Sequence, residues 1–201
     1  MSEISSRLRL LAVAAAALAG LIPGCGDDPA GAPILFNFHT IEENQAYRSS
    51  QLSGEALSWV IDHYGIKTVV NLRGPNPGKP WYDAEAEVCA EKNVVLVDLP
   101  MSARSLPEPE LLESILQALR DSPRPLLIHC ESGSDRSGAV SGLYRLDILG
   151  QDRETAMREL SPVYWHFRSE KPCMDTLVES YEPTPEWMDW YRAEYLNLEC
   201  R

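Results

Sequence analysis

Basic residues are scarce in this chain of 201 residues, which has 18 Lys and Arg against 30 Asp and Glu. The formal net charge of -12 at pH 7 creates a field that repels other polyanions. This balance argues against nucleic acids and acidic membrane surfaces as partners. Any anion that the protein binds must therefore be held by a local positive site.

Metal-ligand patterns and nucleotide fingerprints are missing as well. The four His residues are scattered, and no Cys or His pair has the spacing of a metal site. No internal repeat or low-complexity block interrupts the chain. Hydrophobic residues still make up 44% of it, which is too many for a disordered protein. We therefore expect a packed globular protein that works without a metal ion or another cofactor.

Long hydrophobic runs are limited to residues 10–22, and a helix that spans a membrane needs about 20 apolar residues. This run follows two Arg residues and stops just before Cys25, as in an export signal. The small residues before Cys25 resemble the lipobox of bacterial lipoproteins, which implies cleavage and lipidation there. A plain cleaved signal is the alternative.

These features predict a signal peptide with a lipobox over residues 1–25 and a tether over residues 26–33. Residues 34–201 would form a single domain with a helical extension at the C-terminus. We expect an exported protein of the periplasm or cell envelope, with the lipid on Cys25 as its only link to a membrane.

Cysteine is sparse too, and its remaining positions are Cys89, Cys130, Cys173 and Cys200. An even number could suggest two disulfides in an oxidising compartment. We do not pair all four, because Cys89 lies on the apolar side of a predicted helix, where a buried thiol is more common. Cys173 and Cys200 could form a bridge, and Cys130 belongs to a separate motif.

Strand-like apolar runs alternate with helical patterns after residue 33, which is typical of an α/β domain. We predict a central, mostly parallel sheet flanked by helices. The predicted strands cover residues 34–38, 46–48, 67–72, 94–99 and 125–129. The predicted helices cover residues 54–64, 82–92, 108–120, 137–149 and 152–160, followed by a mainly helical C-terminal part.

The most informative segment is HCESGSDRSG, residues 129–138, between the last predicted strand and the helix that follows. A loop of small residues that leads into a helix N-terminus is an anion site, because its backbone N–H groups and the helix dipole converge. Phosphate fits there, and Arg136 can hold two of its oxygens in a bidentate hydrogen bond. The same donors favour the thiolate of Cys130, which then lies in line to attack phosphorus.

We call residues 130–136 the cradle loop. Besides Cys130 and Arg136, its members are Glu131, Ser132, Gly133, Ser134 and Asp135. We expect these five residues to surround a bound phosphate, chiefly through their backbone.

The pattern His-Cys-x5-Arg-Ser between a strand and a helix resembles the signature loop of the protein tyrosine phosphatase superfamily. The chain is similar to compact bacterial members of the dual-specificity type. The segments that carry the resemblance outside the loop are NFH at 37–39, YRS at 47–49, GIKTVVNLRG at 65–74 and PMSA at 100–103. The resemblance implies the cysteine-phosphatase fold and hydrolysis of phosphate monoesters through a phosphocysteine on Cys130.

By the same resemblance, Arg136 binds the phosphate and Ser137 hydrogen-bonds the thiolate and eases its departure. His129 would tune Cys130 through hydrogen bonds, or only support the loop structurally.

The general acid is not settled by the sequence. In the superfamily it is normally an Asp on a separate mobile loop, and the stretch after Val97 offers Asp98 and then Glu108 and Glu110. Strand alternation can turn Asp98 away from the site. Asp135 is a second candidate, since it resembles the proposed acid of myotubularin-type loops. Asp135 could instead only orient a neighbouring loop or Arg136, and water remains a further alternative.

The substrate class is inferred from charge. Glu131 and Asp135 at the mouth, together with the net charge, would repel a polyanion. We therefore favour a phosphorylated protein, with phosphotyrosine first, or a small phosphomonoester over a phosphoinositide or inositol phosphate. His166 could line the rim, although a lone His among aromatic residues is more often structural. Arg48 and Arg73 are expected to pair with carboxylates of their own domain.

Two other function classes compete with a phosphatase. A phosphate- or phosphoprotein-binding lipoprotein, a pseudophosphatase, would keep the cradle loop without turnover. A rhodanese-like sulfur transferase also has its cysteine between a strand and a helix, but it does not generally need the terminal Arg. Arg136 followed by Ser137 therefore speaks against sulfur transfer.

Overall fold

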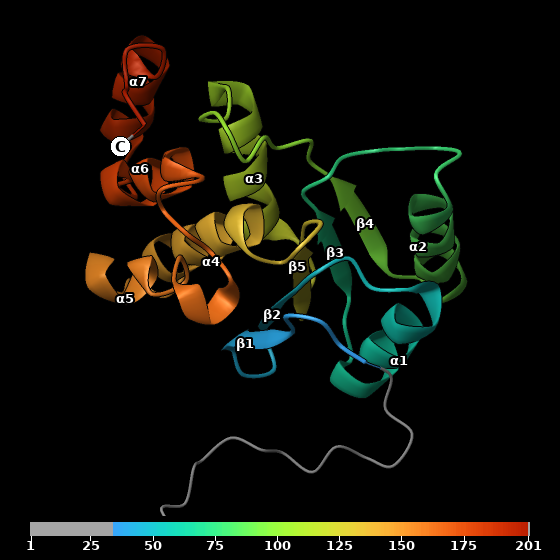
Figure 1. Cartoon of the computed structure of the whole chain (residues 1–201). Coiled ribbons are helices and arrows are strands. Elements are labelled where there is room, and N and C mark those ends of the chain that lie inside the picture. The colour runs from blue at the N-terminus through green and yellow to red at the C-terminus, as the bar shows by residue number, and fades with distance from the viewer. Residues whose placement is uncertain (1–33, 201) are drawn as a thin grey trace, which may run out of the picture. The chain divides into compact units, whose positions relative to one another are not determined.

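A computed structural model describes residues 34–200. The predicted signal peptide, Cys25 and the tether lie outside the described residues. A sheet with the strand order β1-β2-β5-β3-β4 forms the centre of the described part (Figure 1). The strands are β1 (His39–Glu42), β2 (Ala46–Ser49), β3 (Thr68–Asn71), β4 (Val95–Asp98) and β5 (Leu126–His129). Only the pair of β1 and β2 is antiparallel, which confirms the predicted mostly parallel sheet.

Helices cover both faces of this sheet (Figure 1). They are α1 (Gly54–Tyr64), α2 (Pro80–Glu91), α3 (Pro109–Asp121), α4 (Asp135–Asp147), α5 (Arg153–Met157), α6 (Pro172–Ser180) and α7 (Pro185–Glu194), with a 3-10 turn η1 (Pro162–Tyr164). Side chains that alternate along each strand supply one core on each face. Val69 and Leu127 pack on the side of α1 and α2, whereas Val70 and Ile128 pack on the side of α3, α4 and α6.

Local signals explain why the best-predicted helices begin and end where they do. The Ser53 hydroxyl accepts a hydrogen bond from the Ala56 amide and caps α1, and Gly65 ends this helix in a left-handed conformation. The predicted range 54–64 is confirmed. Asp152 caps α5 in the same way through the Thr155 amide, although α5 is shorter than predicted. The predicted range 152–160 is therefore wrong at its C-terminal end.

The first strand differs from the prediction. Residues 34–38 do not form a strand, and β1 lies at His39–Glu42. Ile34 and Phe36 are 79% and 71% exposed, so their hydrophobic character does not mark a buried strand. Pairing with β2 decides the position instead, because His39 lies opposite Arg48 and Thr40 opposite Tyr47.

The C-terminal part folds back onto α3. The Tyr191 hydroxyl donates to the Pro107 carbonyl, and a disulfide joins Cys173 to Cys200. The bridge that the sequence left open is thus present. Cys89 is buried without a disulfide, as predicted, and burial raises the pKa of its thiol to about 12.

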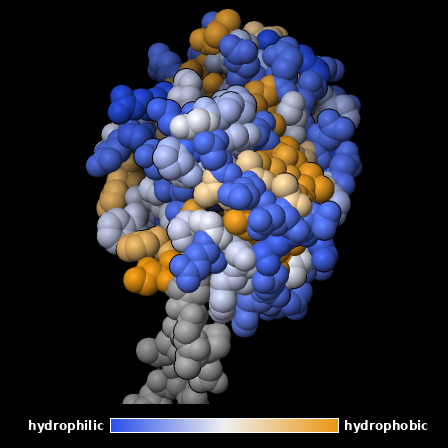
Figure 2. Space-filling model, turned by 90° about the vertical axis from the view of Figure 1, so that its right-hand side faces the viewer, coloured by the Kyte–Doolittle hydropathy of each residue, from blue (hydrophilic) through white to orange (hydrophobic). Residues whose placement is uncertain are grey.

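The surface on the side of α1 and α2 is mostly hydrophilic, with hydrophobic side chains in a few groups (Figure 2). Within residues 34–200, no helix combines the length and the hydrophobicity that crossing a membrane requires.

Candidate active site

The cradle loop begins directly after β5, the middle strand of the sheet. β5 is fully buried and pairs in parallel with β2 and β3. The carboxyl ends of β3, β4 and β5 therefore meet at one edge of the sheet, where ligand sites of open α/β sheets are found. The loop leads into α4, which begins at Asp135.

Each carbonyl of residues 130–134 accepts a hydrogen bond from a group outside the loop. His129 Nδ1 lies 3.3 Å from the Cys130 carbonyl, and Gln51 N donates to the Glu131 carbonyl at 3.1 Å. Asn37 Nδ2 donates to the Ser132 carbonyl at 3.0 Å. Arg48 Nη2 donates to the carbonyls of Gly133 and Ser134, at 2.7 and 3.1 Å. Among the described residues, the amides of residues 131–135 donate to no other protein group.

These carbonyl bonds fix the direction of the amides. The loop peptides are trans, because the one cis bond in the described part precedes Pro125. In a trans peptide the C=O and the next N–H point in opposite directions. The amides of residues 131–135 therefore point away from the outer donors and toward the inside of the loop. This is the arrangement of an anion-binding nest.

Arg48 on β2 is the main support of the loop, although it is completely buried. Its Nη2 holds the Gly133 and Ser134 carbonyls, and its Nη1 lies 2.6 Å from Glu159 Oε2. The expected pairing of Arg48 with a carboxylate is confirmed. Arg73 differs from the expectation, because its guanidinium stacks on Trp81 and donates to Gln51.

Gly133 is the residue that lets the loop pass close to β2. Its φ of +74° lies in the left-handed region. A Cβ atom here would lie 2.6 Å from the Ser50 amide nitrogen and 2.9 Å from the Ser49 carbonyl oxygen, which is closer than such contacts occur. Glycine therefore fits this position for two independent reasons.

Cys130 is buried at the start of the loop, and Ser137 is buried in the first turn of α4. The Ser137 hydroxyl has no hydrogen-bond partner among the described residues. A buried hydroxyl without a partner is costly, so this group is available to a ligand or a thiolate.

Arg136 at the end of the loop is anchored along one edge. Its Nη1 donates to the carbonyls of Leu72 and Met101, at 3.2 and 3.3 Å. Its Nη2 lies 4.0 Å from the exposed carboxylate of Glu131. Two segments thus orient the guanidinium, and donors remain for an anion.

His129 is held on both sides. Its Nε2 lies 2.6 Å from the Glu85 carboxylate, which is itself buried in α2. Its Nδ1 faces the Cys130 carbonyl. His129 therefore joins α2 to the start of the cradle loop.

A cavity of about 400 Å³ opens at the mouth of the loop. Its lining residues are Met101, Ser102, Ala103, Arg104, Glu131, Ser132, Asp135, Arg136 and Lys171. Three of these carry positive charge and two carry negative charge, so the local repulsion expected from Glu131 and Asp135 is offset. Within the described range, no group of three or more His, Cys, Asp or Glu is placed to hold a metal ion.

The proposed general acids differ in their access to this cavity. Asp135 lines it, whereas Asp98, Glu108 and Glu110 are not part of its lining. Both oxygens of Asp98 accept hydrogen bonds, one from Asn71 and one from the Tyr82 hydroxyl. The bond to Asp98 is the main cause that raises the pKa of Tyr82 to about 12. Asp98 thus fastens α2 to the strand ends.

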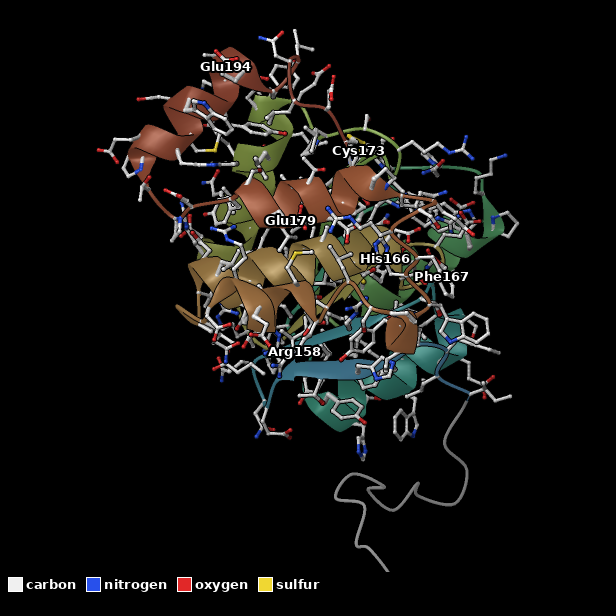
Figure 3. The ribbon with its side chains drawn as sticks, turned by 60° about the vertical axis from the view of Figure 1, so that its left-hand side comes forward. Arg158, His166, Phe167, Cys173, Glu179 and Glu194 are labelled. Atoms are coloured by element: carbon white, nitrogen blue, oxygen red, sulfur yellow. A yellow bond between two sulfur atoms is a disulfide. The ribbon has the colours of Figure 1, made fainter. Side chains whose placement is uncertain are left out.

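Asp135 is the first member of a chain of three side chains. Its Oδ1 lies 2.8 Å from Nδ1 of His166, and Nε2 of His166 lies 2.8 Å from Oδ2 of Asp175. His166 is buried between α4 and α6 (Figure 3). The structural reading of His166 is therefore correct, and this His also touches a residue of the cavity.

Several of these groups have no signal in the sequence. Glu85, Glu159 and Asp175 are buried carboxylates, and each lies far along the chain from at least one of its partners. Asn37 and Gln51 contact the loop through single hydrogen bonds. The unusual positive φ of Asn37, at +50°, becomes visible only in the structure.

Comparison with known proteins gives one family match, over residues 37–169. The family is described as "DSP-PTPase phosphatase fused to NAD+ Kinase". The match includes all five strands of the described residues, the whole cradle loop and His166.

Similar relatives include the dual specificity protein phosphatase TpbA from two strains of Pseudomonas aeruginosa, at 28% and 27% identity over 116 residues. The aligned part is 57% of this chain and 49% of each relative. The chain thus spans about half the length of the curated relatives it matches.

Solved structures share the fold. A P. aeruginosa TpbA variant in complex with pTyr has a TM-score of 0.57 and 19% identity, with 86% of this chain and 100% of that chain covered. The core catalytic domain of the PP-IP phosphatase SIW14 from S. cerevisiae has a TM-score of 0.60 and 20% identity, with 82% and 96% covered. The predicted cysteine-phosphatase fold is confirmed.

Proposed function

The chain belongs to the family of DSP-PTPase phosphatases, and on this basis we propose that it hydrolyses phosphate monoesters with Cys130 as the nucleophile. The substrate phosphate binds in the cradle loop, held by the loop amides and by Arg136. The sulfur of Cys130 attacks phosphorus, so that a P–S bond forms while the bond from phosphorus to the ester oxygen breaks. Water then attacks the phosphocysteine, which releases phosphate and returns the thiolate.

The observation that carries this proposal is the set of outer hydrogen bonds to the carbonyls of residues 130–134. They orient the loop amides for an anion before any ligand binds, which is how preorganised sites stabilise charge in a transition state. The Ser137 hydroxyl has no hydrogen-bond partner within residues 34–200, which supports its role as a donor to the leaving thiolate.

For the substrate we propose a phosphomonoester, with phosphotyrosine preferred. The complex of a TpbA variant with pTyr supports this choice by similarity. The cavity beside the loop offers Arg104 and Lys171 to acidic groups next to the phosphorylated residue. A phosphorylated protein with acidic neighbours fits these charges.

The proposal is tested by an assay of the purified protein for hydrolysis of an aryl phosphate. We expect vanadate-sensitive release of phosphate, and we expect Cys130→Ser and Arg136→Lys to remove it. Cys89→Ala is the matched control, because Cys89 is also a buried thiol but lies outside the cradle loop. If the protein binds phosphate but releases no product from the aryl phosphate, the result would contradict the proposal and favour a phosphate-binding lipoprotein without turnover.

We further propose that the protein is exported and anchored at the cell envelope through Cys25. The disulfide between Cys173 and Cys200 supports an oxidising compartment. Labelling with a radioactive fatty acid tests the anchor: wild type should incorporate label, and Cys25→Ser should not. Equal labelling of both would contradict the anchor.

A further inference from the structure

A second cavity, of about 350 Å³, lies on one flank of the cradle loop. Three loop residues line it, namely Glu131, Ser132 and Ser134, and Phe36 and Trp165 contribute aromatic side chains. Most of the lining surface is apolar, and the size is that of sites for small organic groups. We call it the aromatic cavity, and the hydrolysis proposed above makes no use of it.

Exposed hydrophobic side chains are concentrated next to the aromatic cavity. Among the eight large hydrophobic side chains that are exposed in the described part, five come from residues 34–36 and 163–167. Phe36 and Trp165, which line the cavity, are 71% and 77% exposed. The other three are Ile34, Val163 and Phe167, of which Figure 3 labels the last. Such a concentration of exposed apolar surface marks a site of interaction with another molecule.

Asn37 joins these two segments to each other and to the cradle loop. Its Nδ2 donates to the carbonyls of Ser132 and Tyr164, both at 3.0 Å. Its Oδ1 accepts a hydrogen bond from Nε2 of His39, also at 3.0 Å, because an amide oxygen can only accept. One side chain therefore fixes the position of both segments relative to the loop.

The backbone that carries the two aromatic side chains is held by further hydrogen bonds. The Phe36 carbonyl accepts hydrogen bonds from the amide and the hydroxyl of Ser50, at 3.1 and 2.8 Å. The Trp165 amide donates to the Pro162 carbonyl at 3.0 Å, and the φ of Trp165, +64°, is rare for a bulky residue. A backbone that is already ordered loses little entropy when a ligand binds beside it.

The aromatic cavity adjoins the cavity at the mouth of the cradle loop, because Glu131 and Ser132 line both. The two cavities differ in charge. Arg104 and Lys171 line the one at the mouth, whereas Glu131 is the one charged residue of the described part that lines the aromatic cavity. A peptide segment whose phosphate lies in the loop leaves the loop in two directions. At about 3.3 Å per residue of extended chain, a few residues on either side are enough to pass the loop.

On these grounds, and resting on the proposed function, we infer that the aromatic cavity binds a hydrophobic side chain of the substrate protein, from a residue close to the phosphorylated one. Phe36 and Trp165 are the residues that select for it. Burial of an apolar side chain against them stabilises the complex, and Glu131 disfavours an acidic side chain at this place. The preferred substrate segment therefore carries acidic residues on one side of the phosphotyrosine and a hydrophobic residue on the other.

A leucine scan of phosphotyrosine peptides tests the inference on the unmodified protein. Each peptide has one Leu, within three positions before or after the phosphotyrosine, in an otherwise constant background of Ala and Asp. We expect Leu at one or two positions on the same side to raise kcat/KM about 10-fold over the parent peptide. The gain should appear in KM, because the contact is equal in the ground state and the transition state. No gain at any position would overturn the inference.

Trp165→Ala and Phe36→Ala test which side chains form the site. In each variant the ratio of kcat/KM between the best Leu peptide and its parent should fall toward 1. Trp190→Ala is the matched control, because Trp190 is also an exposed Trp but lies on α7 and does not line the cavity. It should keep the ratio of the wild type. An unchanged ratio in Trp165→Ala, or an equal fall in Trp190→Ala, would contradict the assignment.

A lipid surface is the other occupant that exposed aromatic residues suit. If no Leu position gives a gain and the wild type sediments with phosphatidylcholine vesicles more strongly than Trp165→Ala, then Trp165 contacts lipid and the inference is overturned. Equal hydrolysis of all peptides would end the inference and leave the proposed function intact. No hydrolysis of any peptide or of an aryl phosphate would end both.

Discussion

Residues outside the cradle loop hold it open to an anion. Arg48 is completely buried, and one side chain serves Glu159 and two loop carbonyls together. Burying a cation is costly unless all its partners are present. The loop and the core ion pair are therefore one unit, and a change in either should affect both stability and phosphate binding.

We expect Arg48→Met to lower the free energy of unfolding by up to about 3 kcal/mol, because the buried Glu159 loses one of its two ion-pair partners and keeps Arg145. KM for an aryl phosphate should also rise, because the Gly133 and Ser134 carbonyls lose their donor. Urea unfolding and steady-state kinetics measure the two effects.

Arg158→Met is the matched control for Arg48. Arg158 lies on the surface (Figure 3), where it pairs with Glu154 and is 71% exposed. Exposed pairs of this kind contribute about 0–1 kcal/mol. Equal losses in the two variants would contradict the role given to Arg48.

Gly133 allows a second test at this scale. Alanine in a left-handed conformation costs about 1–2 kcal/mol, and at Gly133 the new Cβ would also collide with the backbone of Ser49 and Ser50. We expect Gly133→Ala to remove most activity and to lose more stability than Gly78→Ala. Gly78 has a φ of +85° but open space around it, so it isolates the cost of the conformation. If the two variants have similar stability and activity, the predicted collision of the Cβ atom at position 133 with the backbone of Ser49 and Ser50 would be contradicted.

At the scale of elements, local signals were sufficient for some segments and not for others. Ser53 and Gly65 mark both ends of α1, and the alternation of apolar strand and small-residue loop located β5 and Cys130. These features depend on residues close in sequence. The strand predicted at residues 34–38 is wrong, and β1 lies at His39–Glu42 instead. The side chains of Ile34 and Phe36 are hydrophobic as in a strand, but they are exposed and their residues pair with no other strand of the described part.

In the candidate active site, too, some residues could be predicted from local sequence and others could not. Cys130, Gly133 and Arg136 could be placed from one short motif. The contacts of Asp135 with His166 and of Arg48 with Glu159 span 31 and 111 positions, respectively. Such contacts depend on how α5 and α6 pack against α4, and hydrophobic periodicity carries no information on which buried polar groups meet. Asp175 and Glu159 were therefore beyond the reach of the sequence.

The disulfide between Cys173 on α6 and Cys200 after α7 should stabilise the C-terminal part of the fold. Closing a loop with a sequence separation of 27 residues should stabilise the fold by about 3 kcal/mol. We expect dithiothreitol to lower the melting temperature of the wild type. The double variant Cys173→Ala with Cys200→Ala should melt at that lower temperature and should not respond to dithiothreitol. A wild type that does not respond to reduction would contradict this contribution.

At the scale of the whole molecule, stability should depend on pH through His166. Its pKa is raised from 6.5 to about 9 in the folded state. The contribution is therefore complete below pH 6.5 and is lost as the pH rises through 9. The difference in unfolding free energy between wild type and His166→Gln should shrink over this range. A difference that grows with pH would contradict the charged state of His166.

The reaction itself should not depend on a metal ion, since a thiolate, a guanidinium and backbone amides supply the nucleophile and the charge stabilisation. We expect kcat and KM for an aryl phosphate to be unchanged after dialysis against EDTA. Loss of activity that zinc or magnesium restores would refute this expectation.

The phosphorylated form of Cys130 is the most direct test of the account. Wild-type protein mixed with an aryl phosphate, quenched rapidly in acid and digested should yield the peptide that contains Cys130 with one added phosphoryl group, detected by mass spectrometry. Cys130→Ser should give none on sulfur. Turnover by the wild type with no phosphorylated Cys130 would contradict the central claim.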